Sequence, residues 1–118
     1  MGYEVTVYDF YIPDLTLEQA QALTDRYWWL FRDEYPLLEI SMKDSETLEV
    51  QHTILWKNCD DWYEDLKQFC KDAAALTGKT AYFVFIGESG DIMGFRFNPD
   101  GTEYEPTICW EVVENEKA

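Results

Sequence analysis

Residues 80–97 read TAYFVFIGESGDIMGFRF, and this stretch decides the fold. Residues 81–86 form an unbroken apolar and aromatic run, which is typical of a central strand that is contacted on both faces. The glycine-containing segment 87–91 then predicts a hairpin turn, and 92–97 predicts the returning strand. Residues 98–101 (NPDG) predict a type I turn with glycine where a positive φ is needed. An antiparallel meander is therefore expected in the C-terminal part of the chain.

A last strand is expected over residues 104–112, where apolar and acidic residues alternate. Pro106 suits an edge strand, because proline has no amide to donate to a ladder. This alternation predicts that Glu103, Glu105 and Glu111 share the face opposite Tyr104. Residues 114–118 are expected to be a frayed acidic tail, which leaves 1–113 as a single α+β domain.

The N-terminal part begins with a strand over residues 3–11, which are rich in Tyr, Val and Phe. Thr16 and Gln19 then form the pattern of a capping box, which marks the start of a helix. Apolar residues recur at three- and four-residue steps after this start, so the helix is expected to run to about residue 34, before Pro36.

A hairpin and a second helix complete the predicted elements. Residues 38–42 and 48–56 alternate between apolar and polar side chains, as expected for two strands with one covered face. Asp60 or Asp61 is expected to cap the second helix, with Asp61 and Glu64 as a second capping box. Gly78 is expected to end that helix in the left-handed conformation.

The order β-α-β-β-α-β-β-β resembles a ferredoxin-like split β-α-β plan with extra hairpin strands. Such a plan places both helices on one face of a mainly antiparallel sheet and leaves the other face uncovered. Alternate residues of the central strand point to opposite faces, so one of two trios must point outward. Either Tyr82, Val84 and Ile86 do so, or Ala81, Phe83 and Phe85 do.

Composition excludes several classes of protein. The chain has 118 residues, of which 47% are hydrophobic and 17% aromatic, so it can bury a core and is not of the disordered class. Its formal net charge is −15 at pH 7. Because nucleic acids are bound by neutralising phosphates with cations, this charge argues against direct nucleic-acid binding and favours a basic protein partner.

The expected location is the cytoplasm. Cys59, Cys70 and Cys109 form no CxxC pair and no disulfide framework. The first residues lack the basic and apolar regions of a signal peptide, and no apolar run approaches the ~20 residues that span a bilayer. We therefore expect no membrane association.

The chain offers little catalytic chemistry. His52, the only histidine, falls with Val50 on the predicted core face, where a structural role is expected. His52, Cys59 and the neighbouring aspartates lack any known metal-ligand spacing. No catalytic residue, metal or cofactor is therefore expected, although a small acid/base enzyme around His52 and Asp91 stays open as a third class.

Trp29 is the first candidate for partner binding. At 100° per residue it falls opposite the apolar stripe of the first helix, near Asp25 and Asp33. Either another segment covers this tryptophan, or it anchors a partner, since Trp and Tyr are enriched at binding hot spots. Glu103, Glu105 and Glu111 are the second candidate group, as acidic neighbours of the uncovered sheet face.

Residues 87–97, 100–101 and 108–110 (Ile-Cys-Trp) resemble small uncharacterised ferredoxin-like proteins of phages and other mobile elements. In size and acidity the chain is also similar to anti-CRISPR and other anti-defence inhibitors. These resemblances imply a non-enzymatic inhibitor that docks on the basic, nucleic-acid-binding surface of a host protein, such as a nuclease complex. The alternative is a housekeeping ligand-binding or assembly domain that forms a homodimer through its open sheet face.

Overall fold

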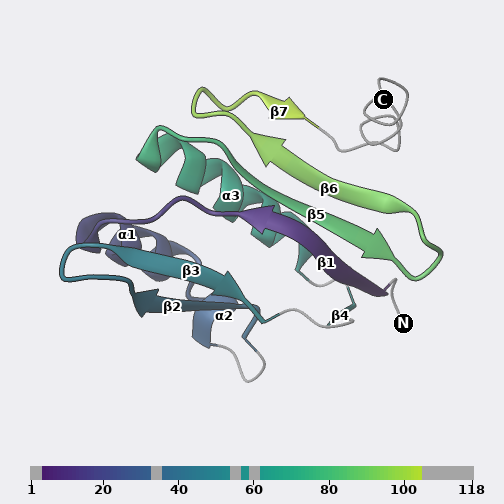
Figure 1. The fold of residues 1–118 in the computed structure, drawn as a ribbon, viewed down its shortest axis with the longest axis horizontal. Helices are drawn as coiled ribbons and strands as arrows, with labels where there is room; N and C mark the ends of the chain where they lie inside the picture. The colour runs from purple at the N-terminus through teal and green to yellow at the C-terminus, as the bar shows by residue number, and fades with distance from the viewer. Residues whose placement is uncertain (1–3, 33–35, 54–56, 59–61, 105–118) are drawn as a thin grey trace.

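The computed structural model describes residues 4–32, 36–53, 57–58 and 62–104. This part of the chain forms an α+β structure whose paired strands are antiparallel (Figure 1). Its helices are α1 (Leu17–Arg26), α2 (Trp28–Arg32) and α3 (Tyr63–Thr77). Its strands are β1 (Glu4–Tyr11), β2 (Leu38–Met42), β3 (Leu48–His52), β4 (Lys57–Asn58), β5 (Ala81–Gly87), β6 (Ile92–Phe97) and β7 (Glu103–Tyr104).

The strands form two sheets. Five of them follow the order β4-β1-β5-β6-β7, and β2 pairs with β3 in a separate hairpin. A bridge between Leu15 and Leu48 joins this hairpin to the segment after β1, with two backbone hydrogen bonds of 2.8 Å. The hairpin therefore lies beside the end of β1, as Figure 1 shows.

The helices lie on one side of the strands, behind them in Figure 1, and the core lies between the two layers. Phe83 and Phe85 of β5 are fully buried with Phe69 of α3. The trio of Ala81, Phe83 and Phe85 thus faces the helices, because all three belong to the core cluster. Tyr82, Val84 and Ile86 point to the opposite face, which resolves the choice between the two trios.

The first predicted helix is divided in two. The capping box at its start is confirmed, because Thr16 Oγ1 accepts from Gln19 N at 3.1 Å and Gln19 Oε1 accepts from Thr16 N at 2.9 Å. The prediction of one helix to residue 34 is wrong, since α1 ends at Tyr27 with φ −121° and ψ 41°. The Tyr27 ring packs on Phe69 and its hydroxyl donates to Asp72 of α3, so core packing prevails over helix continuity here.

Strand β1 contains a bulge that the sequence analysis missed. Val7 is paired with Phe85, whereas Asp9 is paired with the adjacent Val84, so Tyr8 is one extra residue on β1. The bulge reverses which side chains face the core. On the N-terminal side of the bulge, Val7 packs against the core. On the C-terminal side, Phe10 packs against the core and Asp9 lies on the uncovered face.

The ends of the other elements confirm some predictions and correct others. Gly78 ends α3 with φ 73°, as expected for a left-handed cap. The predicted side-chain cap of this helix is wrong, because its N-cap is Trp62 and makes no side-chain cap hydrogen bond. Residues 54–56, Asp60, Asp61 and most of the predicted last strand lie outside the described residues, as does the tail 114–118.

Candidate docking surface on the uncovered sheet face

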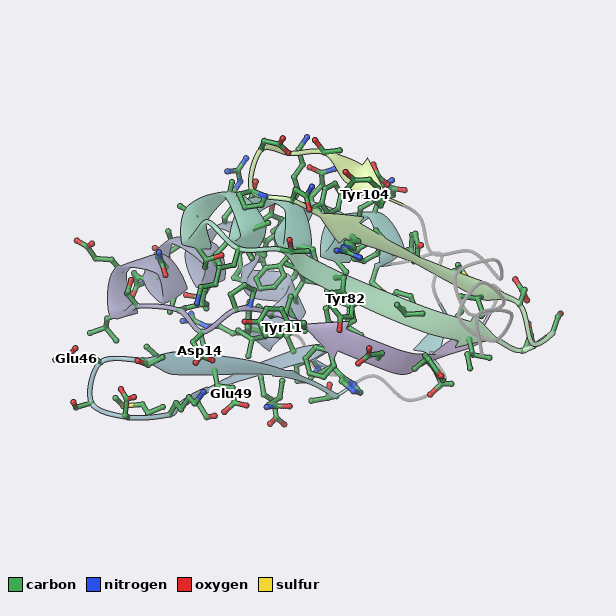
Figure 2. All side chains as sticks on the ribbon, turned by 45° about the horizontal axis from the view of Figure 1, so that its top comes forward. Tyr11, Asp14, Glu46, Glu49, Tyr82 and Tyr104 are labelled. Atoms are coloured by element: carbon green, nitrogen blue, oxygen red, sulfur yellow. The ribbon has the colours of Figure 1, made fainter. Side chains whose placement is uncertain are left out.

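Four side chains form a row across the uncovered face. Tyr11 of β1 is paired with Tyr82 of β5, Tyr82 with Arg96 of β6, and Arg96 with Tyr104 of β7. We call these four residues the tyrosine row. Directly paired residues share a face, and strands are ~4.8 Å apart, so the row spans about 14 Å. Figure 2 shows Tyr11, Tyr82 and Tyr104 following one another across the sheet.

Tyr11 contacts Tyr82 and Arg96 contacts Tyr104, and the two outer tyrosines stay accessible. The ring centroids of Tyr11 and Tyr82 lie 6.3 Å apart, and the Arg96 guanidinium lies 6.0 Å from the centroid of Tyr104. Tyr11 is 45% exposed and Tyr104 is 50% exposed. Tyrosine and arginine are enriched at binding hot spots, so the row has the composition of a protein interface.

Asp9 gives the row a fixed negative charge. The Tyr82 hydroxyl donates to Asp9 Oδ2 at 3.2 Å, and the other carboxylate oxygen accepts from the amide of Phe10 at 2.9 Å. Burial and the nearby carboxylate raise the pKa of Tyr82, so its phenol stays protonated. Among the residues that the structure describes, no lysine or arginine forms a salt bridge with Asp9.

More acidic residues lie beside the Tyr11 end of the row. Asp14, on the segment before α1, and Glu49 of β3 lie toward this end, whereas Glu46 lies at the far tip of the β2–β3 hairpin (Figure 2). Lys43 neutralises Asp14 through a salt bridge of 2.8 Å. At the hairpin the uncovered face is therefore bordered by Glu49 and by the Asp14–Lys43 ion pair.

Trp29 does not lie where the sequence analysis placed it. It is half-buried against the core, and its Nε1 donates to Asp65 Oδ2 of α3 at 2.9 Å. The helix break at Tyr27 changes the phase of α2 and turns the adjacent Trp28 outward, to 54% exposure. Of the two alternatives for Trp29, the structure shows the one in which another segment covers it, and Trp28 is the exposed tryptophan of α2.

Two of the predicted acidic residues, Asp25 and Glu103, lie in the described part of the chain. Asp25 is exposed on α1 and accepts from Gln21 Nε2 at 2.9 Å. Glu103 is paired with Phe97, which faces the helices, and it forms a salt bridge of 2.9 Å with Lys67 of α3. The prediction that Glu103 borders the uncovered face is therefore wrong, and Tyr104 takes that face instead. Asp33, Glu105 and Glu111 lie outside the described residues.

His52 and Asp91 lie near opposite ends of β1. The His52 ring meets Phe10 edge-on with centroids 4.9 Å apart, and burial lowers the pKa of the imidazole. The carbonyl of Asp91 accepts from Gly87, which is paired with Val5. Val5 and Phe10 are about 16 Å apart along β1, so the two side chains do not form an acid/base pair.

Two further kinds of chemical site are a reactive cysteine and a metal site. Cys70 is fully buried in α3, and this burial raises the pKa of its thiol well above the ordinary value. Within the described ranges no group of three or more His, Cys, Asp or Glu side chains is arranged to hold a metal ion. No helix in these ranges is long and apolar enough to cross a membrane.

Comparison with known proteins assigns no relative. No protein-family model, curated protein or solved structure matches the chain.

Proposed function

We propose that this chain is a non-enzymatic binding protein that docks on a basic surface of another protein. The observation that carries the proposal is the tyrosine row on a sheet face that none of the helices in the described residues covers. Exposed tyrosines supply contact area at low entropic cost, because each has only two rotatable side-chain bonds. The charge of −15 supplies long-range attraction to a cationic partner.

The same charge makes a nucleic acid an unfavourable ligand, because phosphates would be brought close to Asp9 and the acidic hairpin. A protein surface that normally receives nucleic acid is basic, and it would be attracted. The role that fits best is therefore a cytoplasmic inhibitor of the anti-defence type, carried by a mobile element and competing for such a surface on a host nuclease complex.

A ferredoxin-like plan is the fold that we propose for this inhibitor. β4 pairs antiparallel with β1, and β3 lies beside the end of β1 through the Leu15–Leu48 bridge. If β3 and β4 are two halves of one strand position, the order becomes β2-β3/β4-β1-β5. That order is the split β-α-β arrangement, with β6 and β7 added at the edge.

Homodimerisation through the same face is the second candidate. The outward trio of β5 contains Ile86, which is partly exposed, and Val84, which is only 4% exposed, so the centre of this face is apolar and Ile86 is its accessible part. Apolar patches on an uncovered sheet face favour association. Sedimentation velocity separates the two candidates, since a dimer that survives dilution to nanomolar concentration would support this second one.

The leading proposal is tested by capture from the lysate of the native host on immobilised protein. The row variant combines Tyr11→Ser, Tyr82→Ser and Tyr104→Ser. The matched control combines Leu17→Ser, Trp28→Ser and Leu76→Ser, which are exposed outside the uncovered face. We expect the wild type and the control to capture the same basic proteins at low salt and to release them at high salt. Equal capture by the row variant would contradict the proposal.

A further inference from the structure

We propose that Asp9, Tyr11 and Tyr82 receive one arginine or lysine side chain of the partner, and we call these three residues the cation site. This inference rests on the proposed function and deepens it, because it names the chemistry of the contact. It concerns one end of the tyrosine row.

The geometry of the three residues suits a cation. The faces of tyrosine rings attract cations that lie within about 6 Å of the ring centroid. The Tyr11 and Tyr82 rings are tilted by 35° with centroids 6.3 Å apart, so one cationic group can contact both rings. Asp9 is held beside Tyr82 by the hydroxyl contact of 3.2 Å, and its charge lies at the same end of the row.

The other end of the row already holds a cation in this way. The Arg96 guanidinium lies 6.0 Å from the ring centroid of Tyr104. This internal pair shows that the uncovered face places a guanidinium on a tyrosine ring. Since Arg96 is directed to Tyr104, its charge does not neutralise Asp9 through a salt bridge.

The β1 bulge builds the cation site. Because Tyr8 is an extra residue, Asp9 and Tyr11 fall on the outward face while Phe10 points to the core. Without the extra residue the alternation set by Val5 and Val7 would turn Asp9 inward. The site thus depends on a local departure from regular strand pairing, which is a common feature of binding sites.

A cationic segment of a partner protein is the occupant that charge favours. A second copy would offer Arg96 as the cation, but it also brings a charge of −15 to the interface. A single-stranded nucleic acid would offer bases to stack on the tyrosines, but its phosphates would approach Asp9. These two occupants are the competing outcomes of the test.

The test is an NMR titration of the uniformly 15N-labelled protein with a tetra-arginine peptide. The neutral control probe is the tetra-citrulline peptide, which keeps the shape of the side chains. We expect shift changes centred on Asp9, Tyr11 and Tyr82 with the arginine peptide and none with citrulline. We expect Asp9→Asn to raise the Kd about five-fold or more, as the loss of one charge beside a cation–π contact should.

Two further variants separate a local contact at the cation site from a general effect of net charge. Glu88→Gln removes the same charge from an exposed turn at the other end of β5 and should change the Kd less than about two-fold. Tyr11→Leu should weaken binding as Asp9→Asn does, and it tests the site even if Asp9→Asn fails to fold. Equal effects of Asp9→Asn and Glu88→Gln would overturn the cation site but leave a basic partner possible on general charge.

Two further results would overturn the inference in favour of another occupant. If the protein is a dimer that Arg96→Ser converts to a monomer, the cation belongs to a second copy. If an oligouridylate shifts the same resonances at concentrations where tetra-arginine does not, the row is a base-stacking surface, and the proposed function fails with it.

Discussion

The indole N–H of Trp29 donates to a carboxylate oxygen of Asp65 at 2.9 Å, and this bond joins α2 to α3. We expect Trp29→Phe to lower the free energy of unfolding by about 1 to 2 kcal/mol, because a half-buried hydrogen bond to a charged acceptor is lost while most of the ring packing remains. Urea denaturation measures this change. Trp28→Phe is the control and should cost less than about 0.5 kcal/mol, since Trp28 is 54% exposed. Equal losses of unfolding free energy for the two variants would show that the Trp29–Asp65 hydrogen bond does not stabilise the fold.

Gly94 allows β5 and β6 to approach closely. Its φ is 148°, and a Cβ placed on it would lie 2.2 Å from the carbonyl oxygen of Phe83. Gly94→Ala should therefore destabilise the protein by about 3 kcal/mol or more, or prevent folding. Gly90→Ala is the matched control, because Gly90 also has a positive φ but no neighbour within 4 Å. It should cost only about 1 to 2 kcal/mol in the same denaturation experiment. A milder effect at Gly94 than at Gly90 would be inconsistent with this packing.

Tyr27 should make the stability sensitive to alkali. Burial, followed by its hydrogen bond to Asp72, raises the pKa of the Tyr27 phenol in the folded state above its ordinary value of about 10. The resulting stabilisation is fully present below pH 10 and is lost as the pH rises above it, because only the unfolded state then releases the proton. Between pH 9 and 11 the wild type should lose about 1 kcal/mol more stability than Tyr27→Phe. Parallel curves for the two proteins would show that Tyr27 is not the cause.

His52 should make the stability of the protein sensitive to acid. Burial lowers the pKa of its imidazole in the folded state below the ordinary value of 6.5. The contribution of the neutral imidazole to the free energy of unfolding is fully present above pH 6.5. It is lost as the pH falls through the folded-state pKa, because the unfolded state binds the proton at a higher pH than the folded state does. Melting temperatures between pH 7 and 5 should fall more steeply for the wild type than for His52→Phe, which keeps the ring contact with Phe10. A variant with the same slope would exclude this linkage.

The sequence predicted those elements that local chemistry determines. The capping box of Thr16 and Gln19 and the left-handed Gly78 depend on hydrogen bonds and backbone angles within one turn, so both could be found from residue types alone. The β5–β6 turn is likewise local, and Gly90 has a φ of 87° there. The outward trio of β5 could not be chosen from the sequence, because both of its faces are apolar.

The features that the sequence analysis missed depend on tertiary contacts. The helix break at Tyr27 follows from its contacts with Phe69 and Asp72, which lie more than 40 residues away, and the exposure of Trp28 depends on that break. The bulge did leave a signal in the sequence. The core residues of β1 change from odd to even positions between Val7 and Phe10, and only an inserted residue can reconcile the two halves.

The bulge at Tyr8 also means that the deletion of one residue would exchange the inward and outward faces of the second half of β1, without any other change in the sequence. Without Tyr8, the carboxylate of Asp9 would point into the hydrophobic core and the ring of Phe10 would point to solvent. Homologous chains of this architecture should therefore keep the number of residues between Val7 and Phe10 constant.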